Sequence, residues 1–263
     1  MAVNRIWLHL FGEGIVRTPD NFGALGEKPS HPELLDHLAV QFMDQGWSTK
    51  KLIKAIVLSR TYQLSSGHDA ASYKADPDNR MVWRMNQRRL DAEASRDAIL
   101  AVSGQLKLDP PAGSLSNFTG AKGAAGKKGP PPDSGHRSVY LGIVRGAPLP
   151  ESLAVFDVAN PNLVVAQREI TTVPVQALFL LNSPFMVEQS KGLAQRLLDA
   201  KAADDPARVD LAYRIALARP ATDGERSRAL AYIAQLTQEK DKPTAWAGFC
   251  QALLASAEFR YLR

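Results

Sequence analysis

The segment at residues 166–189 constrains the fold more than any other part of the chain. It holds two apolar runs at helical spacing, and each run opens with a proline, Pro174 or Pro184. Proline is favoured at the first position of a helix, because its fixed φ suits the turn and that position needs no N–H donor. Ser183 stands directly before the second proline, where its hydroxyl can accept a hydrogen bond from the first turn. The segment therefore predicts two consecutive helices that meet at a sharp corner.

Helical periodicity also covers most of the remaining chain, with apolar residues at i, i+3, i+4 and i+7. Two sequences of the capping-box type, Ser30 with Glu33 and Thr222 with Glu225, predict helix starts. Ser48 predicts a third start by capping. The further predicted helices cover residues 3–11, 30–45, 48–57, 91–102, 209–217, 222–236 and 244–254.

Signals for strands are few. Residues 138–144 are dense in β-branched and aromatic side chains and predict one strand, and residues 163–166 predict a second, short one. Residues 108–136 consist mainly of Gly, Pro, Ala, Ser and Lys, a composition that buries too little apolar surface to offset the cost of ordering. The fold class that follows is mainly α: a helical bundle-like domain over residues 1–263, with a small β element and a long flexible loop.

The positive charge is concentrated near that loop. The formal net charge is +5, and residues 111–150 hold five basic residues against one acidic residue. A nucleic-acid interface would need a basic groove with aromatic stacking residues, and this stretch has no such pattern. We therefore interpret its charge as promoting solubility and expect no nucleic-acid partner.

Several kinds of chemistry lack their motifs. The sequence has no Walker loop, no dinucleotide-binding glycine motif, no H-E-x-x-H and no G-x-S-x-G. Cys250 is the only cysteine, so covalent haem or a thiolate metal site is excluded, and the five histidines are scattered. We expect no cofactor and no metal. No apolar run reaches the roughly 20 residues that span a bilayer, and the sequence shows no signal peptide, so we expect no membrane span.

The candidates for catalysis are two carboxylates and one histidine. Asp91 and Glu93 crowd the start of a predicted helix, and His31 stands at the start of another. In an enzyme the two carboxylates would perform acid–base work. In a structural role they would favour the helix by meeting the positive end of its dipole. We favour the structural interpretation.

A second polar cluster precedes the helix that Pro174 opens, and Thr171 or Thr172 is predicted to cap that helix. In a binding site, Arg168 would clamp a polar ligand such as a sugar or a carboxylate. In a structural network, the same groups would fix an irregular loop, and truncating Arg168 would cost on the order of 3–5 kcal/mol. The residue types fit both roles, and we favour the second. The candidate ligand-binding residues are Arg168, Thr171, Gln176, Asn182 and Asp157.

Spaced motifs along the whole chain carry a family resemblance. They include V-N-R-I-W-x-H-L-F-G at 3–12, P-S-H-P-E-L-L-D at 29–36, S-R-T-Y at 59–62, R-R-L-D-A-E at 88–93, T-T-x-P-x-Q-A-L at 171–178 and L-A-R-P at 217–220. In these motifs the chain resembles the planctomycete-type domain of unknown function 1553. The resemblance implies the C-terminal part of a large exported protein, behind a second uncharacterised domain and often a c-type cytochrome domain. It implies no reaction and no catalytic residues.

Two functional hypotheses follow. The first is a helical module without a catalytic motif, part of a larger exported or cell-envelope protein, that engages polysaccharide or another extracellular polar ligand. The alternative is a hydrolase in which Asp or Glu acts with His31 in a cleft near Arg168. A cleft that joins Asp91, Glu93 and His31 to Arg168 would favour the enzyme.

Overall fold

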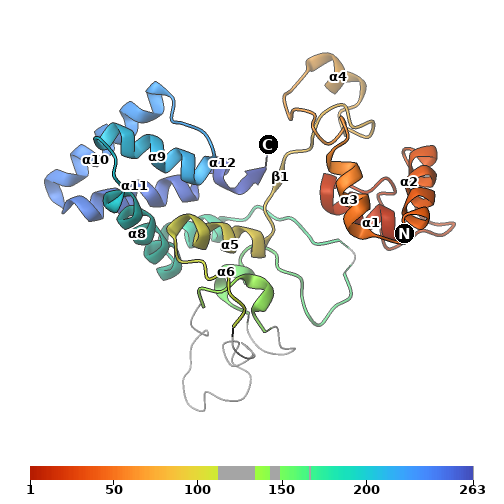
Figure 1. Ribbon diagram of the computed structural model, residues 1–263, viewed down its shortest axis with the longest axis horizontal. Helices are drawn as coiled ribbons and strands as arrows, with labels where there is room; N and C mark the ends of the chain where they lie inside the picture. Colours follow the sequence, from red (N-terminus) through yellow and green to blue (C-terminus); the bar gives the residue numbers. More distant parts are fainter. Residues whose placement is uncertain (112–133, 143–148, 166, 263) are drawn as a thin grey trace, which may run out of the picture. The chain divides into compact units, whose positions relative to one another are not determined.

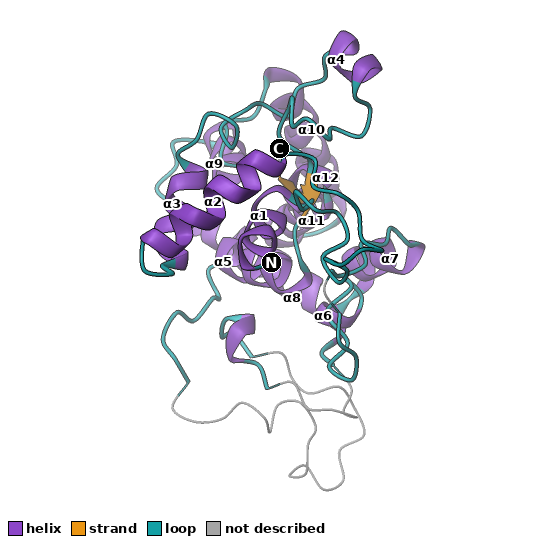
Figure 2. Cartoon of the chain, turned by 90° about the vertical axis from the view of Figure 1, so that its right-hand side faces the viewer, coloured by secondary structure: helices purple, strands orange, loops and turns teal. Residues whose placement is uncertain are grey.

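The computed structural model describes residues 1–111, 134–142, 149–165 and 167–262. The described residues contain twelve α-helices, and 56% of the chain is helical. One small antiparallel sheet pairs β1 (Arg88–Arg89) with β2 (Tyr261–Leu262). Figure 2 shows that helices (purple) predominate and that the strands (orange) are short. The predicted fold class, mainly α with a small β element, is therefore confirmed.

The backbone groups into two compact units, Met1–Arg88 and Arg89–Leu262. The sequence suggested one compact unit. That single domain stays a prediction. The apolar side chains of the first unit pack on one another and form a buried cluster of their own. Each unit is described separately below, with element labels as in Figure 1.

The first unit is built around the aromatic residues of its first helix. Trp7 and Phe11 stack with their ring centroids 4.1 Å apart, and Phe42, Leu52 and Ile56 belong to the same buried cluster. Gly12, at φ 86°, ends the first helix directly after the predicted range 3–11. The helices of this unit are α1 (Ala2–Phe11), α2 (Pro32–Asp44), α3 (Thr49–Val57) and α4 (Ala70–Ala75).

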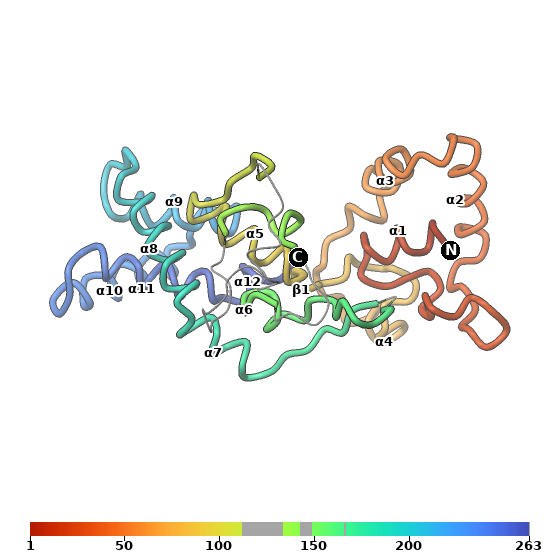
Figure 3. Tube along the Cα trace, turned by 90° about the horizontal axis from the view of Figure 1, so that it is seen from below, coloured from red at the N-terminus to blue at the C-terminus, as the bar shows by residue number. Residues whose placement is uncertain are grey.

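The second unit is organised around α8 and α11, which lie side by side in Figures 1 and 3. Leu193 and Leu197 of α8 and Trp246 and Leu254 of α11 are completely buried where the helices meet. Gln251 of α11 donates hydrogen bonds to the last carbonyls of the preceding short helix α7. The helices of this unit are α5 (Ala92–Ser103), η2 (Ser138–Tyr140, a 3-10 helix), α6 (Glu151–Ala154), α7 (Pro174–Asn182), α8 (Pro184–Asp199), α9 (Asp205–Leu217), α10 (Asp223–Glu239), α11 (Lys242–Ala255) and α12 (Ala257–Arg260).

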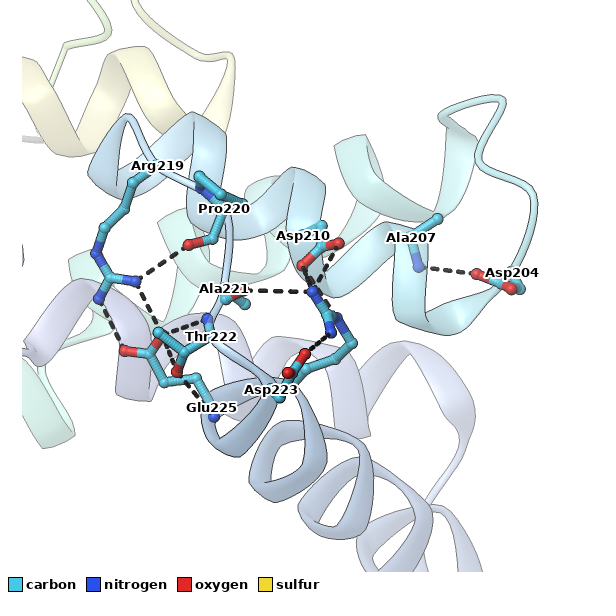
Figure 4. A network of polar contacts seen from close by, with 10 residues as sticks. Asp204, Ala207, Asp210, Arg219, Pro220, Ala221, Thr222, Asp223 and Glu225 are labelled. Carbon is cyan, nitrogen blue, oxygen red and sulfur yellow. Dashed lines mark hydrogen bonds and ion pairs between the residues drawn. The ribbon is translucent and has the colours of Figure 1, made fainter.

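An ion-pair network fixes the corner between α9 and α10 (Figure 4). Arg219 reaches both carboxylate oxygens of Glu225 at 2.8 Å and also binds Glu258 at 2.7 and 2.8 Å. Thr222 and Glu225 form the predicted capping box, so Glu225 serves the helix start and the ion pair together. The hydrogen bonds from Arg219 hold the pKa of Glu225 down at about 2.

Helix starts were predicted correctly where the cap is local. The hydroxyls of Ser48 and Ser183 accept the expected backbone bonds, and Pro174 and Pro184 each stand at a helix start. The predicted capping box of Ser30 and Glu33 is wrong. Helix α2 begins one residue later than that box requires, because Pro32 sets the first turn and His31 takes the cap position. The Ser30 hydroxyl instead contacts the Ile15 carbonyl.

Two further local predictions are wrong. The Thr171 hydroxyl does not cap α7; it donates to Asp157, and Val173 takes the cap position. No strand occurs in the described parts of residues 138–144 and 163–166, since Ser138 turns into a 3-10 helix. Ser138 is held there by Asp97, which accepts hydrogen bonds from its backbone N–H and its hydroxyl.

Residues 112–133, the greater part of the predicted flexible loop, lie outside the described residues. The two ends of the loop meet in a bridge between Lys107 and His136. Arg96 is 1% exposed. It donates hydrogen bonds to the carbonyls of Ser134 and His136, where the chain returns from the loop. These contacts close the loop at its base.

Candidate functional site

The centre of the predicted polar cluster is Arg89, a residue that the sequence analysis did not select. Its side chain is 4% exposed. Its guanidinium donates to Asp157 Oδ2 at 2.6 Å, to Gln176 Oε1 at 3.1 Å and to the carbonyl of Thr171. Three of the five candidate ligand-binding residues, namely Asp157, Thr171 and Gln176, are therefore brought together by one buried cation.

Asp157 links Arg89 to the chain segment that contains Thr171. Besides the ion pair with Arg89, it accepts the backbone N–H of Thr171 at 2.9 Å and the Thr171 hydroxyl at 2.8 Å. Burial acts to raise the pKa of Asp157, but the hydrogen bonds from Thr171 and Arg89 outweigh it, so the pKa lies below its usual value. The backbone of Asp157 has φ 61°, a conformation that Asp tolerates better than most residues. The carboxylate thus ties the 156–158 turn to the chain segment before α7.

Gln176 closes the cluster from the helix side. It is 2% exposed, accepts from Arg89, and donates to the Val155 carbonyl at 3.1 Å. Its position on the first turn of α7 is set by Pro174. A buried amide whose oxygen and nitrogen both have protein partners fits a structural role.

Arg168 and Glu93 form a separate pair. The two guanidinium nitrogens of Arg168 meet the two oxygens of Glu93 at 2.6 and 2.9 Å. The pair is partly open, with the side chains 36% and 29% exposed. Burial acts to raise the pKa of Glu93, but hydrogen bonds led by Arg168 outweigh it, and the pKa lies below its usual value. Glu93 raises the pKa of Arg168 in turn.

This pairing determines what the two groups can do. A general acid needs a raised pKa, and Glu93 is shifted the opposite way. Arg168 could clamp an anionic ligand only by giving up its bond to Glu93. Asp91 is the N-terminal cap residue of α5 without a side-chain cap bond, and it adds to the negative field at Arg168.

The remaining predicted residues lie elsewhere. Asn182 is exposed at the end of α7. His31 belongs to the first unit, where it lines a small hollow and contacts the Ser30 hydroxyl through Nδ1 at 3.0 Å. The hydrolase hypothesis joins His31 to residues of the second unit, and it stays a prediction.

The residues missed from sequence are the two buried arginines, Arg89 and Arg96. Arg89 stands in the R-R-L-D-A-E motif and Arg96 one turn beyond it. The available signal was the cluster of six charged residues in and before the helix, Arg88, Arg89, Asp91, Glu93, Arg96 and Asp97. This is more charge than is needed to complement the helix dipole. The partners of the two buried arginines lie about 40 to 90 residues further along the chain, as for Arg96 with His136 and Arg89 with Gln176.

The described residues contain no group of three or more His, Cys, Asp or Glu side chains that could hold a metal ion. Cys250 is buried in α11, and burial raises the pKa of its thiol well above the usual range. Within the described ranges, no helix combines the length and the hydropathy that a membrane crossing takes.

The fold is mainly helical, and the charged groups of the two polar clusters, Arg89 with Asp157 and Arg168 with Glu93, are paired with one another. A family model described as PSD1, protein of unknown function (DUF1553), matches residues 1–233. The match covers most of the chain, so the chain belongs to this family, and the resemblance found in its motifs is confirmed. No curated protein and no solved structure matches the chain.

Proposed function

We propose that this chain is a non-catalytic helical module of a larger exported or cell-envelope protein, and that it engages a polysaccharide or another polar extracellular ligand. The larger setting, with an uncharacterised upstream domain and a c-type cytochrome domain in the same polypeptide, rests on the family resemblance alone. The non-catalytic role rests on the site.

One observation carries this proposal: the predicted Arg168, and Arg89 at the centre of the polar cluster, are already bound to carboxylates of the same unit. Arg89 holds Asp157, and Arg168 holds both oxygens of Glu93. The lowered pKa values of Asp157 and Glu93 keep both groups ionised, which suits ion pairing and does not suit general-acid catalysis. The cluster is then a device that fixes the loop before α7 on the helical core.

The test measures whether the chain binds polysaccharides and whether it cleaves them. The purified chain would be run through gels that contain neutral or acidic polysaccharides, and the same polysaccharides would be assayed for newly released reducing ends. We expect retarded migration with at least one polysaccharide and no release of reducing ends. Release that disappears in Glu93→Gln would refute the non-catalytic role and favour the hydrolase hypothesis. Unchanged migration with every polysaccharide would refute the proposed ligand class.

The polypeptide setting has its own test. In cells that make the natural full-length protein, an antibody against this chain is expected to detect a band much larger than the chain itself, in the envelope or exported fraction. A band in the cytoplasmic fraction alone would refute that part of the proposal.

A further inference from the structure

The first unit carries a surface hollow that is separate from the polar cluster of the second unit. Its outer part is an open, shallow depression with a volume of about 560 Å³. Ser30 and Arg80 line both the outer part and a narrower inner part, so the two are continuous. The outer part is lined by Glu27, Lys28, Pro29, Ser30, Arg80 and Met81.

One wall of the hollow is a loop closed on itself by Thr18. The Thr18 hydroxyl donates to the Asn21 carbonyl at 2.9 Å and accepts the backbone N–H of Glu27 at 3.0 Å. Gly26 is required in this loop, because a Cβ atom there would lie 1.9 Å from the Asn21 carbonyl oxygen. The closed loop places Glu27 and Lys28 at the rim.

The opposite wall is the turn at residues 76–84, and it is held even more tightly. The carboxylate of Asp76 accepts the backbone N–H groups of Arg80 at 2.9 Å and Met81 at 2.7 Å. Asn79 and Val82, on either side of these two residues, have φ 51° and 52°. Positive φ is rare for a β-branched residue, and such outliers cluster at ligand clamps and active sites. The strained turn holds Arg80 at the hollow.

The charges that line the hollow favour an anion. Arg80 bridges the two walls through a single nitrogen, Nη2, which bonds Glu27 at 2.7 Å. Its other guanidinium N–H groups have no partner among the described residues, unlike Arg168, whose two terminal nitrogens both bind Glu93. Arg17 in the inner part has Glu13 at 3.9 Å. Lys28 has no carboxylate partner among the described residues. One uncompensated ammonium and one guanidinium therefore line the same hollow, and the His31 ring lines the inner part. Arginine and lysine side by side are well suited to carboxylate, sulfate or phosphate oxygens.

We infer that this hollow binds an oxyanion group, and that its ligand is an acidic saccharide bearing carboxylate or sulfate. Lys28 and Arg80 bind the oxyanion, and the polar groups of Glu27 and Ser30 accept and donate hydrogen bonds to neighbouring hydroxyls. This inference rests on the proposed function, since it names the class of polysaccharide and the site that binds it.

The experiment is calorimetric titration of the full chain with three probes: trigalacturonate, a sulfated trisaccharide and neutral maltotriose. We expect binding of an acidic trisaccharide, no binding of maltotriose, and weaker binding as salt is raised, because exposed charges are screened. The test variant is Lys28→Gln with Arg80→Gln. The control is Lys50→Gln with Lys54→Gln, which makes the same charge change at exposed positions of α3.

The test variant is expected to bind the acidic trisaccharide about tenfold more weakly, and the control is expected to bind it as the unaltered chain does. Lys28→Gln alone, which breaks no ion pair, is the second variant, should the double change disturb folding. Inorganic sulfate is expected to compete with the saccharide, and its failure to compete would argue against an oxyanion site.

Two results would overturn the inference while the proposed function stands. One is an acidic trisaccharide that binds the test variant as tightly as the unaltered chain. The other is binding of neutral maltotriose alone. If no probe binds and no polysaccharide retards the chain, the proposed function falls together with the inference.

Discussion

Truncation of Arg89 and of Arg168 should have very different effects on stability. Arg89 is 4% exposed and holds Asp157 and Gln176. Its removal takes the cation from the Asp157 carboxylate, which is 19% exposed and keeps only its bonds to Thr171, and from the buried Gln176 amide oxygen, which costs about 3–5 kcal/mol. For a unit of this size, that corresponds to a fall of about 10 °C in the midpoint of thermal unfolding.

Arg168→Ala should cost much less than the sequence suggested. Both members of the Arg168–Glu93 pair are about one-third exposed, so water solvates Glu93 once the guanidinium is gone. Pairs of this kind contribute about 1 kcal/mol or less, which corresponds to a fall of about 3 °C. We therefore expect the loss of about 3–5 kcal/mol in the free energy of unfolding for Arg89→Ala and not for Arg168→Ala.

The assay is urea unfolding of Arg89→Ala and Arg168→Ala, followed by far-UV circular dichroism. Gln176→Ala is expected to lose about 2 kcal/mol, because it strands buried polar groups. Asn182→Ala is the control: Asn182 is exposed, and the change is expected to stay within about 0.5 kcal/mol. The reasoning is refuted if Arg168→Ala destabilises the chain as much as Arg89→Ala, or if Arg89→Ala behaves like the Asn182 control.

Three further predictions concern other parts of the chain. The pKa of Glu225 is held at about 2 against a usual 4.5, so the stability that Arg219 confers is complete above about pH 4.5 and is lost as the pH falls towards 2. The midpoint of thermal unfolding should therefore fall with pH across this range, and Glu225→Gln should reduce that fall. Replacing residues 112–133 with a short Gly-Ser linker should leave the melting temperature within a few degrees, because Arg96 binds the returning end of the loop, whereas a larger fall would mean that the segment packs. The purified chain should show no Soret band and no transition metal at one equivalent by elemental analysis, since it has one cysteine and scattered histidines.

The sequence was a good guide where the physics is local. The caps at Ser48 and Ser183 and the box at Thr222 depend on residues within one turn of the helix start. These contacts form in any context that lets the helix form. The helix ends at Gly12 and Gly104, which both adopt positive φ, were predictable for the same reason.

Local signals failed where a distant partner competes for the same side chain. The Thr171 hydroxyl could cap α7, but it binds Asp157, 14 residues earlier in the chain. Ser138 begins a run of strand-forming residues, but Asp97 accepts hydrogen bonds from both its N–H and its hydroxyl. In both cases an ionised carboxylate attracts the donor more strongly than a neutral backbone carbonyl does. A prediction from local sequence cannot rank such contacts without knowing which loops approach.

The two consecutive arginines at the boundary of the units illustrate the same point for the candidate site. As sequence, Arg88 and Arg89 form one motif with the acids that follow. In the structure they have different tasks: Arg88 donates to the His9 carbonyl of the first unit, and Arg89 is buried in the second. Successive side chains of an extended strand point to opposite faces, so two adjacent arginines in β1 can each anchor a different unit. The pairing of Arg89 with Asp157, more than the identity of the residues in the motif, is what favours a structural role for the predicted binding cluster.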